Sequence, residues 1–430
     1  MKKFLLLLFV LLPALMFARE SDVYIGLSSK YNPNDLPKIG LAANKISDFT
    51  PEEEKTYSNL FADVLRSDLY RSRYFNIEEA ASAQVSSLGP QLANLQRQNI
   101  LYYIFFDFSA TGTPDVWQVK AYMYDTGSKK GLLAKSFKVP TKSVRRSAHL
   151  FADQVIKLLT GKRGLSSTKI AFANDSTGRK EIYIVDYDGY NLAKLTNDKS
   201  ISLLPRWADK GTKLYYTTYR NRNPQIYMLD LKEGINTPVM QEKGLNLIGG
   251  VSPDSRKLVM TLSRGQNPSI YLKELASGRT LELTDKYGVD GSPSFSPDGK
   301  FVTFVSNRSG NPQIYIMNLD TKETRRLTRF NWTDSPQWSP NGDWIAFAGR
   351  QVQNHPIDIF LVDITGGQIR QLTADSGSNE DPWWSPDGRF IAFTTNRAGK
   401  RQIYVMDADG SAQHLIANIK GNSFTPSWSD

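Results

Sequence analysis

Residues 292–304 read SPSFSPDGKFVTF, residues 335–347 read SPQWSPNGDWIAF, and residues 381–393 read DPWWSPDGRFIAF. In each, a large apolar residue stands directly before an SPDG-type turn, and this arrangement recurs every 43–46 residues. The six occurrences of that residue are Trp207, Val251, Phe295, Trp338, Trp384 and Trp428. A period of about 20–50 residues is typical of chains that repeat one small structural unit many times.

Two further markers repeat with the same period. A phrase of the type QIY ends at Tyr183, Tyr227, Tyr271, Tyr315, Phe360 and Tyr404. Twelve residues after each of these stands an aliphatic residue: Leu195, Val239, Leu283, Leu327, Leu372 or Ile416. Within a unit, turn residues separate four short apolar runs, which predicts four strands. Four strands in a unit of ~40–50 residues are typical of a β-propeller blade, so three markers with six copies predict six blades.

The two ends of the repeat predict how the ring closes. The first unit begins at a second strand, at residues 169–172, and residues 425–430, TPSWSD, read as a first strand. Pairing the two completes a blade and removes the open sheet edges. We therefore predict a mainly β protein in which residues 164–430 form a six-bladed propeller of four-stranded blades, closed by the C-terminal strand. Two copies depart from the pattern, with Lys210 in one turn and Val251 in place of the aromatic residue.

The segment before the repeat has a different character. Residues 1–18 carry Lys2 and Lys3 followed by an apolar run, which predicts a cleaved secretory signal peptide and an exported protein that does not span the membrane. Residues 19–163 are predicted to form a small α/β domain with an N-terminal tail. Strands are expected at 23–29, 36–43 and in the stretch 99–140, with helices at 52–69 and 143–161. Residues 162–168 read as a linker.

The composition excludes several kinds of chemistry. The chain has no cysteine, so it has neither disulfides nor thiolate metal sites. It has three histidines and none of the common hydrolase, phosphate-loop or metalloprotease motifs, which argues against an enzyme. The formal charge of +10 would suit nucleic acid, but an exported protein does not normally meet nucleic acid. We expect no cofactor and no nucleic-acid partner.

The loops that enter the first strands are the candidate binding surface. They ring one mouth of the propeller channel and, unlike the turns, differ from copy to copy; four of them cover 244–250, 286–292, 330–335 and 375–381. Trp332 is not explained by the repeat and is expected to be an exposed aromatic anchor. Acidic residues in these loops could place negative charge at the mouth and hold a divalent cation there. Ordinary solvated loops remain the alternative for any single residue.

The order of signal, α/β domain, linker and six repeats resembles the TolB family, the periplasmic component of the Tol–Pal system. The stretch DYDGYNLAKLT at residues 186–196 and the final WSD are the most specific features. The resemblance implies a monomeric, non-enzymatic periplasmic scaffold that supports outer-membrane integrity and envelope constriction during cell division. In the family, the channel face binds the peptidoglycan-associated lipoprotein Pal, and the residues after the signal bind TolA.

Carried onto this chain, the resemblance implies two groups of partner-binding residues. The Pal face would comprise Leu245, Ile248, Asp290, Gly291, Ser292, Trp332, Asp334, Ser335, Glu380 and Asp381. The TolA tail would comprise Arg19, Glu20, Ser21, Asp22, Val23 and Tyr24. Two other readings stay open. One is an exported propeller enzyme of the peptidase or polysaccharide-lyase kind, and the other is a binder of another envelope ligand.

Overall fold

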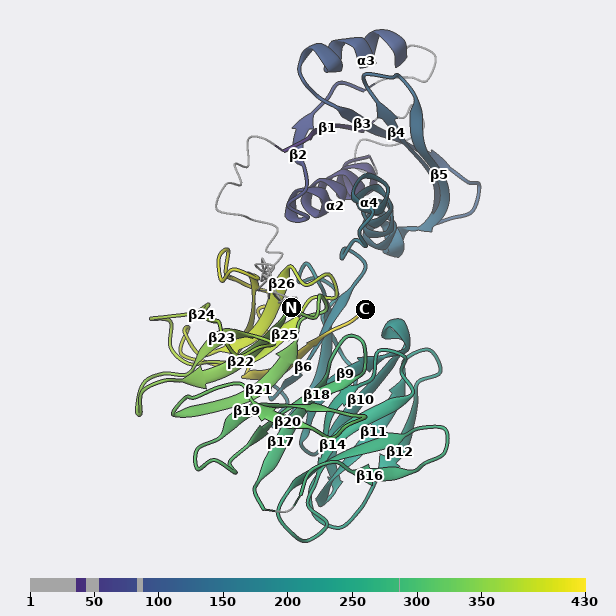
Figure 1. The fold of residues 1–430 in the computed structure, drawn as a ribbon. Coiled ribbons are helices and arrows are strands. Elements are labelled where there is room, and N and C mark those ends of the chain that lie inside the picture. Colours follow the sequence, from purple (N-terminus) through teal and green to yellow (C-terminus); the bar gives the residue numbers. More distant parts are fainter. Residues whose placement is uncertain (1–35, 44–53, 83–87, 286) are drawn as a thin grey trace, which may run out of the picture.

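The structure, a computed structural model, describes residues 36–43, 54–82, 88–285 and 287–430. The predicted signal peptide, the tail at residues 19–24 and the strand expected at 23–29 lie outside the described residues. The described strands form one five-stranded sheet and six four-stranded sheets. Figure 1 shows the first sheet in a small α/β domain that sits on one face of a ring made by the other six. The predicted fold class, a propeller preceded by an α/β domain, is confirmed.

The α/β domain is built around a strand buried on both faces. Side chains alternate along β3, so Phe106 and Phe108 pack against α2 and α4, whereas Tyr103 and Phe105 pack against α3. The sheet order is β2-β1-β3-β4-β5, and helices α2 and α4 lie between this sheet and the propeller (Figure 1). The elements are β1 (Lys38–Ala43), a π-helical turn (Glu54–Ser58), α2 (Asn59–Arg71), β2 (Asn76–Glu79), α3 (Leu88–Arg97), β3 (Tyr102–Ala110), β4 (Val116–Asp125), β5 (Gly131–Pro140), a 3₁₀ turn (Thr141–Ser143) and α4 (Val144–Thr160).

Each blade of the propeller runs from an inner strand at the channel to an outer strand at the rim. The inner strands are β9 (Ser202–Ala208), β13 (Asn246–Val251), β17 (Asp290–Phe295), β21 (Trp332–Trp338), β25 (Asn379–Trp384) and β29 (Ser423–Trp428). The second strands are β6 (Lys169–Asn174), β10 (Lys213–Asn221), β14 (Lys257–Leu262), β18 (Phe301–Ser306), β22 (Trp344–Arg350) and β26 (Phe390–Thr395). The third strands are β7 (Glu181–Asp186), β11 (Asn223–Asp230), β15 (Ser269–Glu274), β19 (Gln313–Asn318), β23 (Asp358–Asp363) and β27 (Gln402–Asp407). The outer strands are β8 (Ala193–Lys194), β12 (Ile235–Met240), β16 (Thr280–Glu282), β20 (Thr324–Arg326), β24 (Ile369–Gln371) and β28 (His414–Leu415).

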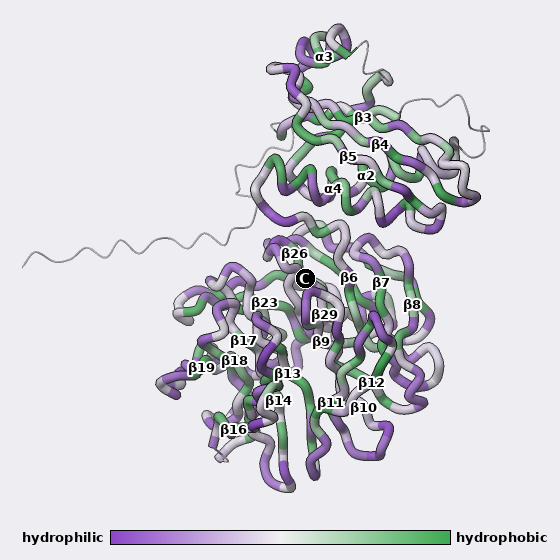
Figure 2. The backbone as a smooth tube through the Cα atoms, turned by 90° about the vertical axis from the view of Figure 1, so that its right-hand side faces the viewer, coloured by the Kyte–Doolittle hydropathy of each residue, from purple (hydrophilic) through white to green (hydrophobic). Residues whose placement is uncertain are grey.

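Hydrophobic residues follow the strands, whereas the turns at the ends of the blades are largely hydrophilic (Figure 2). The recurring aromatic residue packs between blades. Trp384 donates its indole N–H to the carbonyl of Gln337 on the neighbouring inner strand, 3.1 Å away. Trp207 does the same to the carbonyl of Ser427, at 2.9 Å. These side chains therefore hold adjacent blades together, which explains why the sequence repeats them.

The ring is closed by the same kind of hydrogen bond that stabilises the SPDG turns. In those turns the serine hydroxyl accepts the N–H five residues later, as Ser296 does from Phe301 at 2.9 Å. Ser429 Oγ accepts the N–H of Lys169, also at 2.9 Å, across 260 positions of sequence. Strand β29 pairs with β6 in antiparallel register and completes the sheet β29-β6-β7-β8. The predicted closure is confirmed.

The segment that joins the α/β domain to the propeller is held by one carboxylate. Asp153 of α4 accepts the N–H of Ser166 at 2.8 Å and the N–H of Ser167 at 3.0 Å. Gly164 is required here, because a Cβ at this position would lie 2.2 Å from Asp153 Oδ1. Helix α4 ends, as predicted, at Gly161, whose φ of 71° is the left-handed cap that glycine favours. The expected linker is therefore an ordered connection.

Two elements of the α/β domain were not predicted, namely α3 and β2. Helix α3 buries Leu88, Leu92 and Leu95, which have helical spacing, but it is only ten residues long. Strand β2 has four residues, NIEE, of which none is fully buried. Segments this short and polar give too little periodicity to be recognised. Within the described residues, no helix has both the length and the apolar character needed to cross a lipid bilayer.

Candidate binding site at the channel mouth

The channel has two ends, and only one carries the predicted candidate loops. The α/β domain covers part of the other end. There Tyr187, in the β7–β8 turn, donates to Asp68 of α2 at 2.5 Å, and Arg389, in the turn after β25, donates to the carbonyl of Ser72. The loops before the inner strands lie at the opposite ends of these strands. We call the surface they form the mouth face; it comprises residues 195–201, 241–245, 283–289 apart from 286, 327–331, 372–378 and 416–422.

Each inner strand carries a register shift near its middle, and in five of the six the backbone there turns left-handed. The residues with φ between 48° and 55° are Leu204, Ser292, Ser335, Asp381 and Thr425, and each stands before a proline. A left-handed conformation costs a residue other than glycine about 1 kcal/mol or more. The same strained bulge at the same place in five blades indicates that the shape of the channel wall is a property of the fold.

The sixth inner strand, β13, has the register shift but no left-handed residue. Here Gly249 takes the place of the proline, and an added Cβ would lie 2.4 Å from the ring of Pro293 on the next blade. Its neighbour Ile248 is buried and has no left-handed backbone. The departure of this repeat from the pattern, seen in the sequence at Val251, therefore reflects a closer approach of two blades.

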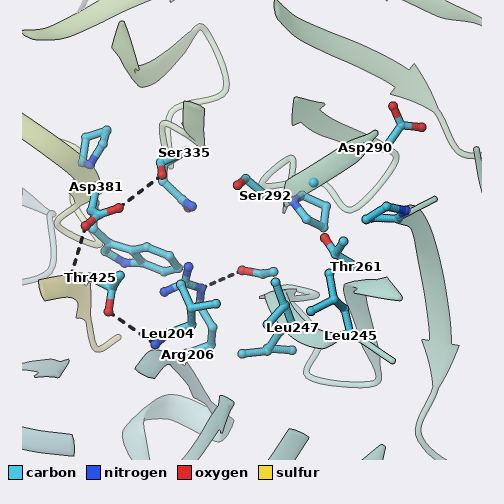
Figure 3. A pocket seen from close by; sticks show the side chains of 18 of the residues that line it. Leu204, Arg206, Leu245, Leu247, Thr261, Asp290, Ser292, Ser335, Asp381 and Thr425 are labelled. Atoms are coloured by element: carbon cyan, nitrogen blue, oxygen red, sulfur yellow. Dashed lines mark hydrogen bonds between the residues drawn. The ribbon is translucent and has the colours of Figure 1, made fainter. Parts of the chain in front are cut away.

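A cavity of about 230 Å³ opens between the inner strands near the mouth face (Figure 3). Seven of the ten residues expected on the Pal face line it: Leu245, Ile248, Asp290, Gly291, Ser292, Ser335 and Asp381. The other three, Trp332, Asp334 and Glu380, are not among its lining residues. The four predicted loops therefore converge on one concave site, which is the geometry of a ligand or partner pocket.

Asp334 nevertheless belongs to the wall of this cavity, through a chain of hydrogen bonds that crosses four blades. Its Oδ1 accepts the hydroxyl of Ser292 at 2.7 Å and the N–H of Ser335 at 2.6 Å. Ser335 then donates its hydroxyl to Asp381 Oδ1 at 3.3 Å, and Asp381 Oδ2 accepts the N–H of Thr425 at 3.2 Å. Because these bonds link neighbouring inner strands, the two carboxyl groups fix the spacing of the blades at the channel.

Two of the channel carboxyl groups, those of Asp334 and Asp381, are held where ionisation is unfavourable. Burial raises the pKa of Asp381, and the negative charges of Glu380 and Asp334 raise it further. Burial also raises the pKa of Asp334, and this effect outweighs the hydrogen bond from Ser292, which lowers the pKa. Glu380 is paired with Arg401, whose Nη1 lies 2.7 Å from its Oε2. The carboxyl groups of Asp334 and Asp381 are therefore harder to ionise than exposed ones.

Asp290, the fourth predicted carboxylate, lies on the far side of the cavity from Asp381 (Figure 3). It is fully buried, and its Oδ2 accepts Arg308 Nη2 at 3.0 Å, while its Oδ1 has no hydrogen-bond partner in the described structure. The four acids therefore do not gather as the expected cation site requires. Among the described residues, the only group of three potential metal ligands lies elsewhere, at Asp68, His149 and Asp188.

That group is an ion-pair network at the junction of the two domains. His149 Nδ1 lies 2.6 Å from Asp68 Oδ2, and Arg145 forms a salt bridge with Asp188. Burial alone would lower the pKa of His149, but the hydrogen bond and charge of Asp68 raise it overall. Tyr187 occupies the second oxygen of Asp68, so protein groups already satisfy most of the ligand atoms. The cluster therefore ties α2 and α4 to the first blade.

The exposed aromatic residue of the mouth face differs from the expected one. Trp332 is half-buried, packs against the core between two blades, and has the guanidinium of Arg350 5.7 Å from its ring centre. Tyr287, in the loop before β17, is 92% exposed, and its neighbour Val289 is 47% exposed and lines the cavity. Like Trp332, Tyr287 is an aromatic residue outside the repeat markers, so the same criterion could have found it.

The fold and the site together define a class: a six-bladed β-propeller with an accessory α/β domain and a pocket at one mouth of its channel. The chain belongs to the TolB β-propeller family, since the family description "TolB beta propeller domain" matches residues 156–430. The Tol-Pal system protein TolB of Desulfosudis oleivorans is 34% identical over 226 residues, which cover 51% of this chain and 50% of that protein. The TolB protein of Rickettsia prowazekii is 38% identical over 109 residues, 25% of each chain.

Among solved structures, TolB from Acinetobacter baumannii has a TM-score of 0.76 and 26% sequence identity, covering 92% of this chain and 96% of that one. The sequence matches to the two curated relatives span half or less of their length. Both relatives carry the name of a Tol-Pal system component, and neither is named for a catalytic activity. Family membership thus agrees with the expectation of a non-enzymatic protein.

Proposed function

We propose that this chain is a non-enzymatic periplasmic scaffold of a Tol–Pal system whose mouth face binds a Pal-like lipoprotein. The observation that carries the proposal is the pocket at the channel mouth, built at equivalent positions of the inner strands, in a chain of the TolB family. Its relatives are named as Tol-Pal system proteins, which supports the same assignment. The role in outer-membrane integrity and cell division belongs to this proposal.

The chemistry of the mouth face suits a protein partner. Tyr287 and Val289 offer exposed apolar surface beside the cavity, and the rim around them is polar. An aromatic residue next to a pocket with a polar rim is the usual make-up of an energetic hot spot at protein interfaces. The wall is held by backbone bulges and by the carboxyl groups of Asp334 and Asp381, so a partner would meet a surface that is already organised.

The second half of the proposal concerns the N-terminal tail. After removal of residues 1–18, residues 19–24 would be free to bind a TolA-like inner-membrane protein. This assignment rests on the family resemblance, since the tail lies outside the described residues. The division into a domain at 19–163 and a propeller at 164–430 is part of the same proposal. It agrees with the change from the α/β sheet to the propeller sheets between α4 and β6.

The test is calorimetric titration of the mature protein with the soluble domain of the Pal-like lipoprotein from its own organism. We expect saturable one-to-one binding that is weakened by Asp334→Ala, because this change removes the acceptor shared by Ser292 and Ser335. Glu274→Ala, on a strand end away from the mouth face, is the control and should leave affinity unchanged. Absence of a complex by calorimetry and by gel filtration would refute the proposed partner. Equal affinities of both variants and the wild type would refute the proposed face.

A further inference from the structure

Below the mouth, one buried arginine occupies the channel. Arg206 of β9 is 8% exposed, and it lines both the mouth cavity and a second cavity of about 260 Å³ that lies toward the SPDG turns. Its Nε donates to the carbonyl of Gly249 at 2.6 Å (Figure 3), and its Nη1 donates to the carbonyl of Pro205 at 2.9 Å. The guanidinium lies 4.6 Å from the ring centre of Trp383. Arg206 therefore stands between the two halves of the channel.

Arg206 has more donors than the channel wall uses. A guanidinium carries five N–H donors, and the two hydrogen bonds that hold Arg206 both go to uncharged carbonyls. Within the described residues, no carboxylate forms a salt bridge with it. Asp381 is the acid that acts on it electrostatically, but the oxygens of Asp381 already accept Ser335, Thr394 and Thr425. A buried cation with unused donors is stabilised by an anion that can accept them.

The fold does not require this arginine. The equivalent positions on the other five inner strands are Gly250, Ser294, Gln337, Trp383 and Ser427. None of these is charged, and those blades close around the channel equally well. Gln337 lines the same two cavities and accepts the hydroxyl of Ser294 through Oε1 at 3.2 Å, which leaves its amide N–H groups as further donors. The cation and the amide thus form a donor-rich section in a channel wall whose other charged groups are acidic.

We propose that the channel binds a carboxylate at Arg206, with the free edge of the guanidinium as the bidentate donor and the indole of Trp383 behind it. Planar carboxylates match the fork of arginine, and an enclosed site strengthens such a pair. The carboxylate could belong to a free small acid or to an acidic side chain that a partner inserts through the mouth. The site itself does not depend on the proposed lipoprotein partner, so the two proposals can fail separately.

The site is tested with trifluoroacetate, a carboxylate small enough for the cavity, and with trifluoroacetamide as its neutral counterpart. Fluorine NMR line broadening of each compound is measured on the mature wild-type protein. We expect the carboxylate to bind, and the amide to bind at least about tenfold more weakly, since one charge-assisted hydrogen bond has that effect on affinity. Equal broadening of the two compounds, or broadening of neither, would overturn the proposal.

Three variants locate the binding. Arg206→Gln should abolish it, whereas Arg279→Gln removes an exposed arginine from the β15–β16 turn and should leave it unchanged. Gln337→Glu places a permanent carboxylate in the same section of the channel and should also abolish binding while Arg206 is kept. This second variant decides the matter if Arg206→Gln does not fold. Retention of binding in Gln337→Glu and in a folded Arg206→Gln would refute the site.

A competition experiment identifies the natural source of the carboxylate. The lipoprotein domain is titrated with and without saturating trifluoroacetate, with sodium chloride at equal ionic strength as the control. A weaker apparent affinity with trifluoroacetate means that the partner inserts an acidic group at Arg206. An unchanged affinity assigns the site to a free small acid. Both results keep the site, and failure of the lipoprotein to bind at all would refute only the proposed partner.

Discussion

Strand β29 is joined to its own blade by contacts alone, which makes Trp428→Ala an informative change. No turn connects β29 to β6, whereas the other inner strands continue into their second strands through SPDG-type turns. Trp428 is 5% exposed and donates its indole N–H to Thr168 Oγ1 at 2.8 Å. Truncating a buried tryptophan costs about 3–5 kcal/mol, and the lost hydrogen bond adds about 1 kcal/mol. The expected total is therefore roughly 4–6 kcal/mol, concentrated on one strand.

The matched control is Phe295→Ala, in the same slot of β17 and 8% exposed. Its strand stays tied to β18 by the turn at residues 296–300, so the loss should be spread over the whole propeller. Hydrogen–deuterium exchange with mass spectrometry measures the difference, because exchange reports local opening in a protein of two domains, where a single unfolding energy is poorly defined. We expect the amides of β29 in Trp428→Ala to exchange at least about a hundredfold faster, and those of β17 in Phe295→Ala to change much less. Protection of β29 within about threefold of wild type would refute the view that these contacts close the ring.

Three further predictions concern the site and the domain junction. Tyr287→Ala should weaken lipoprotein binding by about 2 kcal/mol without lowering the melting temperature, whereas Tyr190→Ala, at a 58% exposed site away from the mouth face, should leave binding unchanged; calorimetry and thermal melts compare them. Burial raises the pKa of Asp334, so its folded state holds a proton more tightly than the unfolded chain, and stability falls as pH rises above the ordinary value of 3.8. Asp334→Asn should remove that fall and be more stable than wild type at pH 7, by about 1 kcal/mol, in urea titrations across this pH range; a less stable variant would contradict the argument. The pKa of His149 is raised in the folded protein. The stability that its ion pair with Asp68 contributes is therefore fully present below the ordinary pKa of 6.5, and it is lost as pH rises through the pKa of the folded state. The protection of the amides of residues 162–168, corrected for the intrinsic rise of exchange with pH, should therefore fall at alkaline pH, and His149→Gln should abolish this fall.

The blades could be predicted from the sequence because their determinants are local and repeated. Ser296 and Phe301 lie five residues apart, so one short segment of sequence contains all the residues that determine this turn. The aromatic slot recurs because most blades meet their neighbours in a similar way, as the bonds of Trp207 and Trp384 show. Helix α3 and strand β2 could not be recognised, because a single short element offers no repetition and little periodicity.

The site was predictable only as a set of loops. The loops at 244–250 and 286–292 do converge on the cavity, since the ring brings equivalent positions together. The exposure of an individual side chain was not predictable, because it depends on how far each loop stands from the next blade. Trp332 folds back against Arg350, whereas Tyr287 stays open to solvent. Arg206 was missed altogether, since it occupies a strand position that the repeat pattern treats as variable.

The strained bulges of the inner strands keep the same backbone path in five blades, although their side chains differ in chemistry. The left-handed bulge recurs at Leu204, Ser292 and Asp381, whose side chains are aliphatic, hydroxyl and carboxylate. Because the proline and the bulge set the path of the chain, the side chain at this position can change without altering the ring. The packed cores of the blades hold the backbone in this conformation and offset its free-energy cost. A propeller built in this way can keep one shape while its ligand changes. Substitutions at the bulge residues, and at Arg206 two residues further along its strand, decide which partner or ligand the channel accepts.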